Sequence, residues 1–221
     1  MKGLWVKDWL VLKKQRLAFG LIFLLALLCL LIFKRFGIEL SMLLFALTVA
    51  FLTLSTVTFD QQNHGLAFLL TLPITKRQYV RQKFLFLLAM VASGTLLMAF
   101  ISAGVNALLH WQLPLQDLSF ITVAIGSGTF MLLSITLQLQ LQKGPEVAQV
   151  AMSLVGAIVA AGIGGIYLLI QRTHWGATVF ANLLKSYQQH GALPFIGCFI
   201  GLSLLVGYVN YRRSHRHLLV R

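Results

Sequence analysis

The sequence predicts an all-α, polytopic membrane protein that crosses the bilayer with six helices and keeps both chain ends on the cytoplasmic side. Of its 221 residues, 58% are hydrophobic and only 10% are charged, so a lipid bilayer suits its surface better than water does. Six apolar stretches approach the ~20 residues that a helix needs to cross the hydrocarbon core. The basic residues gather in alternate connections between these stretches, as they do in membrane proteins with a fixed orientation.

The apolar stretches form one transmembrane domain that covers residues 1–221. The first stretch is followed at once by Lys34 and Arg35 and has no small-residue cleavage site before them, so we interpret it as a retained helix. The two cysteines fall inside expected spans, where cysteine behaves as a small hydrophobic residue. We expect the spans at residues 17–33, 38–59, 84–109, 118–137, 147–170 and 192–209.

The net charge of +13 reflects membrane orientation and predicts no nucleic-acid partner. Basic residues are spread through short connections and both tails, whereas nucleic-acid binding needs one continuous basic face. Fourteen of the 18 lysines and arginines lie in the terminal segments and in the second and fourth connections, and four lie in the first and fifth. Because basic residues are retained on the cytoplasmic side, both termini are expected there.

The first 16 residues predict a separate helix that lies in the membrane interface. The segment is too polar to span a bilayer, yet Trp5 and Trp9 recur at helical spacing while Lys13 and Lys14 offer charge to anionic headgroups. This combination is typical of an amphipathic helix that contacts membrane lipids. The alternative interpretation is a basic anchor that fixes orientation and has no further role.

A short apolar island lies in the cytoplasmic segment 60–83, between the second and third spans. Residues 65–72 are too few to cross a bilayer, so we expect them to lie in the interface or against protein. Pro73 disfavours helical geometry at the residue before it and ends that short helix. The chain is therefore expected to turn a corner at Pro73.

The third span is predicted to begin with a capping box and to extend beyond the membrane. Thr75 and Gln78 have the spacing of this motif. A helix from Lys76 to Leu109 would contain 34 residues and measure about 51 Å at the usual rise. Its basic first turns would project into the cytoplasm, either as a docking surface or as a charged anchor for the span; they carry Lys76, Arg77, Arg81 and Lys83.

The stretch "LLTLPITKRQYVRQKF" resembles the signature of small type-2 permeases of ATP-binding-cassette (ABC) exporters. The family pattern is a leucine-proline pair, a small hydroxyl residue, basic residues, a valine and a lysine that opens the third helix. Asp60 stands where the family usually has an acidic residue. The whole-chain layout of an amphipathic start followed by six spans resembles the family as well. The matching residues are Leu72, Pro73, Thr75, Lys76, Arg77, Val80 and Lys83.

The resemblance implies that the island is a coupling helix, which sits in a cleft of a separate cytoplasmic ATPase. Such docking requires a few apolar anchors within a polar rim. ATP and magnesium would be bound by that partner. A second permease subunit, either identical or related, would complete the pathway in a bacterial cytoplasmic membrane. The residues expected to contact the ATPase are Leu66, Phe68, Leu69, Leu70, Leu72, Pro73, Thr75, Lys76 and Arg77.

The sequence contains no motif that predicts catalysis or a metal or cofactor site in this chain. It lacks the G-x-x-x-x-G-K-[ST] motif of ATP-hydrolysing proteins and the H-E-x-x-H pair of metalloproteases. All five carboxylates lie at or outside the span ends, although ion-coupled transporters usually keep an ionisable residue at membrane depth. We therefore expect a non-enzymatic transport subunit.

Small residues recur every fourth position in the last two spans and predict close helix packing. Gly156, Ala160 and Gly164 form one such row, and Gly197 and Gly201 form another. These rows would lie either between helices of one chain or at a subunit interface.

The uncharged spans favour an amphipathic or lipophilic exported cargo, such as a membrane-active or antimicrobial peptide. The alternative functions are a non-transporting sensor or assembly subunit, and an ion-coupled secondary transporter.

Overall fold

The computed structural model describes residues 2–61, 75–111, 113–144, 146–148, 150, 153–154, 157, 178, 182, 185–187, 189 and 191–216. Within these residues the chain is helical and has no strand, which confirms the predicted fold class for this part. The helices are α1 (Lys2–Lys14), α2 (Arg16–Ile32), α3 (Lys34–Gln61), α5 (Lys76–Leu109), α6 (Leu115–Lys143) and α9 (Leu193–Arg216).

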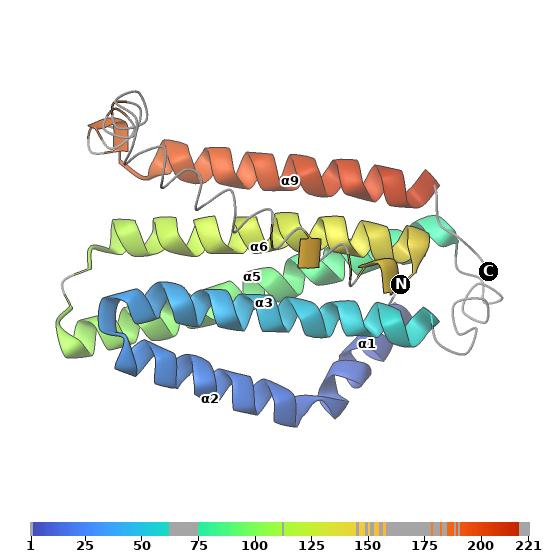
Figure 1. Cartoon of the computed structure of the whole chain (residues 1–221), viewed down its shortest axis with the longest axis horizontal. Helices are drawn as coiled ribbons and strands as arrows, with labels where there is room; N and C mark the ends of the chain where they lie inside the picture. The colour runs from blue at the N-terminus through green and yellow to red at the C-terminus, as the bar shows by residue number, and fades with distance from the viewer. Residues whose placement is uncertain are drawn as a thin grey trace.

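The long helices lie side by side along the longest axis of the molecule (Figure 1). Helix α6 packs against α9, α5 and α3, and α3 in turn packs against α2 and α5. The end of α3, the start of α5, the end of α9 and helix α1 all lie at the right-hand end of the bundle in Figure 1. We call this the loop end, because α3 ends and α5 begins there.

Four described helices are long and apolar enough to cross a membrane: Phe36–Gln61, Lys76–Leu109, Leu115–Lys143 and Leu193–Ser214. Helix α2 has 17 residues, which at the usual rise is about 26 Å and short of the ~30 Å hydrocarbon core. Together with α1, from which it is bent by 69°, it forms a fifth candidate. Most of the expected span 147–170 lies outside the described residues, so six spans stay a prediction.

The buried apolar side chains form two clusters along the bundle. The cluster toward the loop end joins α3, α5 and α6 and includes Leu54, Leu87 and Leu137. The cluster toward the other end also includes α2, with Leu30 packed beside Met42. Each cluster contains side chains from at least three helices, so apolar packing holds the bundle together along its length.

At the turn between α2 and α3, the backbones of the two helices come close together. The N–H of Phe33 donates to the Cys29 carbonyl at 3.1 Å, and Lys34 adopts a positive φ of 50°. Gly37 then lies against α2: a β-carbon added there would be 2.5 Å from the Cys29 carbonyl oxygen and 2.8 Å from that of Leu30. Only glycine fits this crossing without moving the helices.

The contact between α6 and α9 depends on Gly207. A β-carbon at this position would lie 2.6 Å from a ring carbon of Phe130. The amide of Asn210 donates to Ser134 Oγ at 3.0 Å in the same buried interface. This interface therefore combines close backbone approach with a polar link, as is common where helices pack in membranes.

The predicted small-residue rows are only partly within the described residues. Gly197 and Gly201 are exposed, and a β-carbon at either would have no atom within 4 Å. Their role in packing therefore stays a prediction in both of its forms. The row of Gly156, Ala160 and Gly164 lies outside the described residues.

At the end of the bundle away from the loop end, a tyrosine is tied to the start of α6. The Tyr187 hydroxyl donates to Asp117 Oδ1 at 2.7 Å, and its ring packs against Phe120 with centroids 5.4 Å apart. Partial burial, this hydrogen bond and the charge of Asp117 raise the pKa of Tyr187 to about 12. The hydroxyl therefore remains a proton donor at any physiological pH.

Candidate functional site

The segment expected to dock a partner begins and ends at the loop end. Helix α3 ends at Gln61, and α5 begins at Lys76. Six of the nine residues expected to contact the ATPase lie between these helices and outside the described residues, and three lie at the start of α5. The six are Leu66, Phe68, Leu69, Leu70, Leu72 and Pro73; the three are Thr75, Lys76 and Arg77.

The capping box predicted at the start of α5 is confirmed. The backbone N–H of Gln78 donates to Thr75 Oγ1, and the N–H of Thr75 donates to Gln78 Oε1, both at 3.2 Å. Thr75 has the extended backbone of an N-cap, and α5 runs without a break for the predicted 34 residues. The direction in which the segment enters α5 is therefore fixed by local chemistry.

Replacing Thr75 by alanine is expected to lower the free energy of unfolding by about 1 kcal/mol, because the first turn of α5 loses its side-chain acceptor. Thr75→Ser keeps the oxygen and serves as the control. Unfolding of the purified protein in mixed micelles, followed by circular dichroism, measures both variants. Equal stability of the two would show that the cap contributes nothing.

The first two turns of α5 have an exposed side and a buried side. Lys76, Arg77 and Arg81 are exposed, as expected of projecting basic turns. Lys83 is different: only 1% of its surface is accessible. The expectation that Lys83 belongs to the projecting basic surface is therefore wrong, and the reason is that it finds buried carboxylates.

Lys83 is the centre of an ion cluster that joins three helices. Its Nζ lies 2.8 and 2.9 Å from the two carboxylate oxygens of Asp8 in α1. It also lies 2.8 Å from Asp60 Oδ2, near the end of α3. Asp8 and Asp60 are 0% and 7% exposed, so water screens these interactions poorly. One lysine of α5 thus connects this helix with α1 and with the end of α3.

Neighbouring polar groups complete the cluster. The Tyr79 hydroxyl donates to Asp60 Oδ2 at 2.9 Å, and the Gln82 amide donates to Asp8 Oδ2 at 2.6 Å. Lys7, which is partly exposed, pairs with Asp60. Two lysines and two aspartates make the formal charge zero, which is the condition under which buried ions are tolerated.

The cluster specifies one arrangement of helices more than it adds stability. Removing the charges of Asp8, Asp60 and Lys83 from water costs several kcal/mol per ion, and good geometry does little more than offset that cost. A displaced helix would, however, leave an unpaired buried charge, which is strongly unfavourable. We call the ion cluster of Lys7, Asp8, Asp60 and Lys83 the joint, because it connects α1, α3 and α5.

Helix α1 presents different residues to the bundle and to its surroundings. Asp8 and Leu12 face inward and are buried, whereas Trp5 and Trp9 are 37% and 61% exposed. Trp5 packs edge-on against Phe86, with ring centroids 5.4 Å apart. Lys13 and Lys14 are exposed at its last turn. An outward tryptophan stripe suits the interfacial placement, which stays a prediction.

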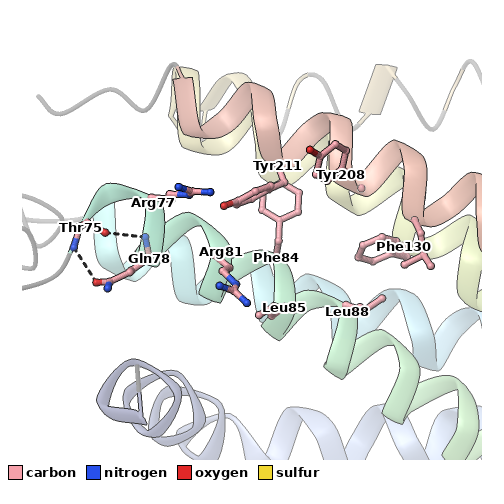
Figure 2. A pocket seen from close by; sticks show the side chains of 12 residues that line it. Thr75, Arg77, Gln78, Arg81, Phe84, Leu85, Leu88, Phe130, Tyr208 and Tyr211 are labelled. Atoms are coloured by element: carbon pink, nitrogen blue, oxygen red, sulfur yellow. Dashed lines mark hydrogen bonds between the residues drawn. The ribbon is translucent and has the colours of Figure 1, made fainter.

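A groove of about 700 Å³ lies beside the joint, between α5 and α9 (Figure 2). Arg77 and Arg81 line its end nearest the segment 62–74, and Phe130 of α6 lines its other end. Tyr208 and Tyr211 contribute from α9. The groove is therefore cationic at one end and apolar along the rest.

Sequence reasoning missed the two aspartates of the joint. The sequence interpretation gave Asp8 no role and matched Asp60 only to the acidic position of the family pattern, yet they are two of just five carboxylates in the chain. The available signal was their scarcity. Asp8 has leucines four residues before and after it, so it shares a helical face with apolar residues and has to find a cation once that face packs. Lys83 was the candidate, because it lies two residues after Arg81 and so faces the opposite side of α5.

The comparisons with known proteins give a family for the whole chain. The sequence matches the family described as ABC-2 family transporter protein over residues 3–218. No curated protein and no solved structure matches it. The matched range contains the motif after Pro73, the ion cluster and every described helix from α2 to α9. The chain therefore belongs to the ABC-2 transporter family and is the membrane subunit of an ABC transporter.

Proposed function

We propose that this chain forms half of the pathway of an ABC exporter and is driven by a separate cytoplasmic ATPase that docks on the segment 60–83. The observation that carries the proposal is the ion cluster. It fixes the end of α3 and the start of α5 to α1 through buried pairs at 2.8–2.9 Å. A segment whose two ends are fixed to packed helices is suited to transmitting a movement of the ATPase to the membrane helices.

Movement of the ATPase would reach the membrane through α5. The capped helix runs from Lys76 to Leu109 as one element, which at the usual rise is about 51 Å and exceeds the bilayer core. A displacement applied to its exposed first turns would be transmitted along the whole helix, because helices are stiff on this scale. The ion cluster would carry α1 and α3 with it.

The cargo that suits this design is amphipathic or lipophilic, for example a membrane-active peptide. In the described spans the hydrophobic residues dominate, with mean hydropathy between 1.8 and 2.4 in their most apolar windows. A hydrophilic solute would need polar partners along its path. A second copy of the chain, or a related permease, would supply the other half of the pathway.

Docking is tested by affinity purification of the tagged protein from its native membranes in mild detergent, followed by mass spectrometry. The test variant is Leu69→Asp plus Arg77→Glu. The first change places a charge among the expected apolar anchors, and the second inverts an exposed cation at the start of α5. We expect a Walker-motif ATPase to co-purify with the wild type and to be lost, at least ten-fold, from the variant.

The matched control carries the same two kinds of substitution at the opposite end of the bundle. Leu108 is 78% exposed there, and Lys34 is exposed at the turn between α2 and α3. Leu108→Asp plus Lys34→Glu is expected to retain the ATPase. If the wild type brings down no ATPase, the exporter assignment is contradicted; if the test variant retains it, the docking segment is wrong.

An ion-coupled secondary transporter would have a different energy source. Flux of the cargo would then follow an ion gradient across vesicles in the absence of ATP. The buried ions of the joint are fully paired and lie at the helix ends, at the start of α5 and the end of α3, whereas coupling sites usually lie at membrane depth. The arrangement therefore favours an ATP-driven subunit.

A further inference from the structure

We propose that the groove between α5 and α9 binds one anionic phospholipid, with its phosphate at Arg77 and Arg81 and an acyl chain along the apolar part. The site requires neither ATP nor cargo, but it shares Arg77 with the proposed ATPase contact, so it is defined and tested for the chain without an ATPase. Its occupant would be a resident lipid from the leaflet on the loop side of the membrane.

The first observation is the charge at the mouth. Arg77 and Arg81 are one helical turn apart on the exposed side of α5, so both guanidinium groups can approach one phosphate. The Arg77 side chain extends toward Tyr211 at the mouth of the groove (Figure 2). Arginine recognises phosphate through paired donors. Two exposed cations favour a headgroup whose phosphate is not neutralised by an ammonium group of its own, so an anionic phospholipid fits better than a zwitterionic one.

The second observation is the apolar wall below the mouth. Leu85 is 43% exposed and Leu204 is 49% exposed, on opposite sides of the groove, and buried Phe130 closes its far end. In a membrane protein, acyl chains ordinarily cover exposed leucines on the two sides of such a groove. Tyr208 and Tyr211 suit the boundary between headgroup and chain.

The third observation is length. The lining residues on α5 extend from Arg77 to Leu88, which is about 16 Å along the helix at the usual rise. Half of the hydrocarbon core is ~15 Å. A phosphate at Arg77 therefore leaves room along the groove for an acyl chain that reaches as far as Phe130.

The leaflet follows from the orientation of the chain. The arginines lie at the loop end, which the distribution of basic residues assigns to the cytoplasmic side. The cytoplasmic leaflet is the one that carries negative surface charge. The occupant is thus phosphatidylglycerol or another phospholipid with one net negative charge.

The test uses quenching of an indole by brominated lipids. The Leu85→Trp protein and its parent are reconstituted, without any ATPase, into phosphatidylcholine bilayers that contain either brominated phosphatidylglycerol or brominated phosphatidylcholine at equal mole fraction. The additional quenching of the Leu85→Trp protein over the parent reports the groove. We expect brominated phosphatidylglycerol to quench it several-fold more effectively than brominated phosphatidylcholine.

Adding Arg77→Gln and Arg81→Gln should abolish this preference, since each cation near the surface contributes on the order of five-fold in affinity. The control is Arg16→Gln plus Lys143→Gln, which removes the same charge from two exposed positions outside the groove and should leave the preference intact. Equal quenching by both lipids, or the same loss in the control, would overturn the proposal. Adding glycerol phosphate should leave the indole of the Leu85→Trp protein quenched. If its fluorescence is restored, the site binds a free anion and the lipid proposal is wrong.

Discussion

Replacing Lys83 by methionine is expected to lower the free energy of unfolding by about 3–5 kcal/mol, the usual cost of removing one partner from a buried ion pair. Methionine fills a similar volume but leaves Asp8 and Asp60 with only Lys7, so the cluster carries an uncompensated negative charge. Chemical denaturation of the purified protein in micelles, monitored by far-ultraviolet circular dichroism, measures the change.

Lys76→Met provides the matched control, since it makes the same substitution seven residues earlier at an exposed position of the same helix. Its effect should stay within about 0.5 kcal/mol. Adding Asp8→Asn to Lys83→Met removes one charge of each sign and should recover part of the loss. If Lys83→Met is no less stable than Lys76→Met, the cluster does not hold α1, α3 and α5 together.

Replacing Gly37 by alanine is expected to cost about 1–3 kcal/mol and to open the hairpin of α2 and α3. The new β-carbon would meet two carbonyl oxygens at 2.5 and 2.8 Å. These atoms belong to the backbone of α2, so no side chain can rotate away and the helices themselves must separate. Thermal unfolding followed by fluorescence-detected size exclusion measures the decrease in the unfolding temperature.

Gly20→Ala is the control for this change. Gly20 also lies in α2, but a β-carbon there would have no atom within 4 Å. Because alanine favours the helix over glycine by about 1 kcal/mol, this variant should be as stable as the parent or more so. Similar destabilisation by both substitutions would show that the hairpin has no special need for glycine at residue 37.

Local chemistry made the start of α5 predictable. Thr75 and Gln78 determine where this helix begins through contacts within a few residues. Hydropathy alone located the stretches that became α2, α3, α5, α6 and α9, although α3, α6 and α9 extend beyond the expected spans by four, six and seven residues at one end. Such signals do not depend on the rest of the fold. These features could therefore be predicted from the sequence alone.

The ion cluster could not be obtained in the same way. Lys83 meets Asp8 across 75 positions of the chain, and nothing local indicates which distant carboxylate a lysine will find. The four basic residues at the start of α5 look alike in sequence, yet packing buries one of them and leaves Lys76, Arg77 and Arg81 exposed. Helical periodicity separates the two faces, but only the tertiary structure shows which one is inside.

The glycines of α9 illustrate the same limit. The repeated spacing predicts close packing at Gly197 and Gly201, whereas the glycine of α9 that lies against a described neighbour is Gly207, beside Phe130. The spacing of glycines identifies where another helix could come close to the backbone. It does not show whether a neighbouring helix lies there.

The most direct test of the docking surface is cross-linking of the unmodified protein in its native membranes with a lysine-reactive reagent, read by mass spectrometry. Lys76 is exposed at the start of α5, and Lys34 is exposed at the opposite end of the bundle. We predict cross-links from Lys76 to a Walker-motif ATPase and none from Lys34. Cross-links to that ATPase from Lys34 alone would contradict the assignment of the loop end as the surface that receives the force of ATP hydrolysis.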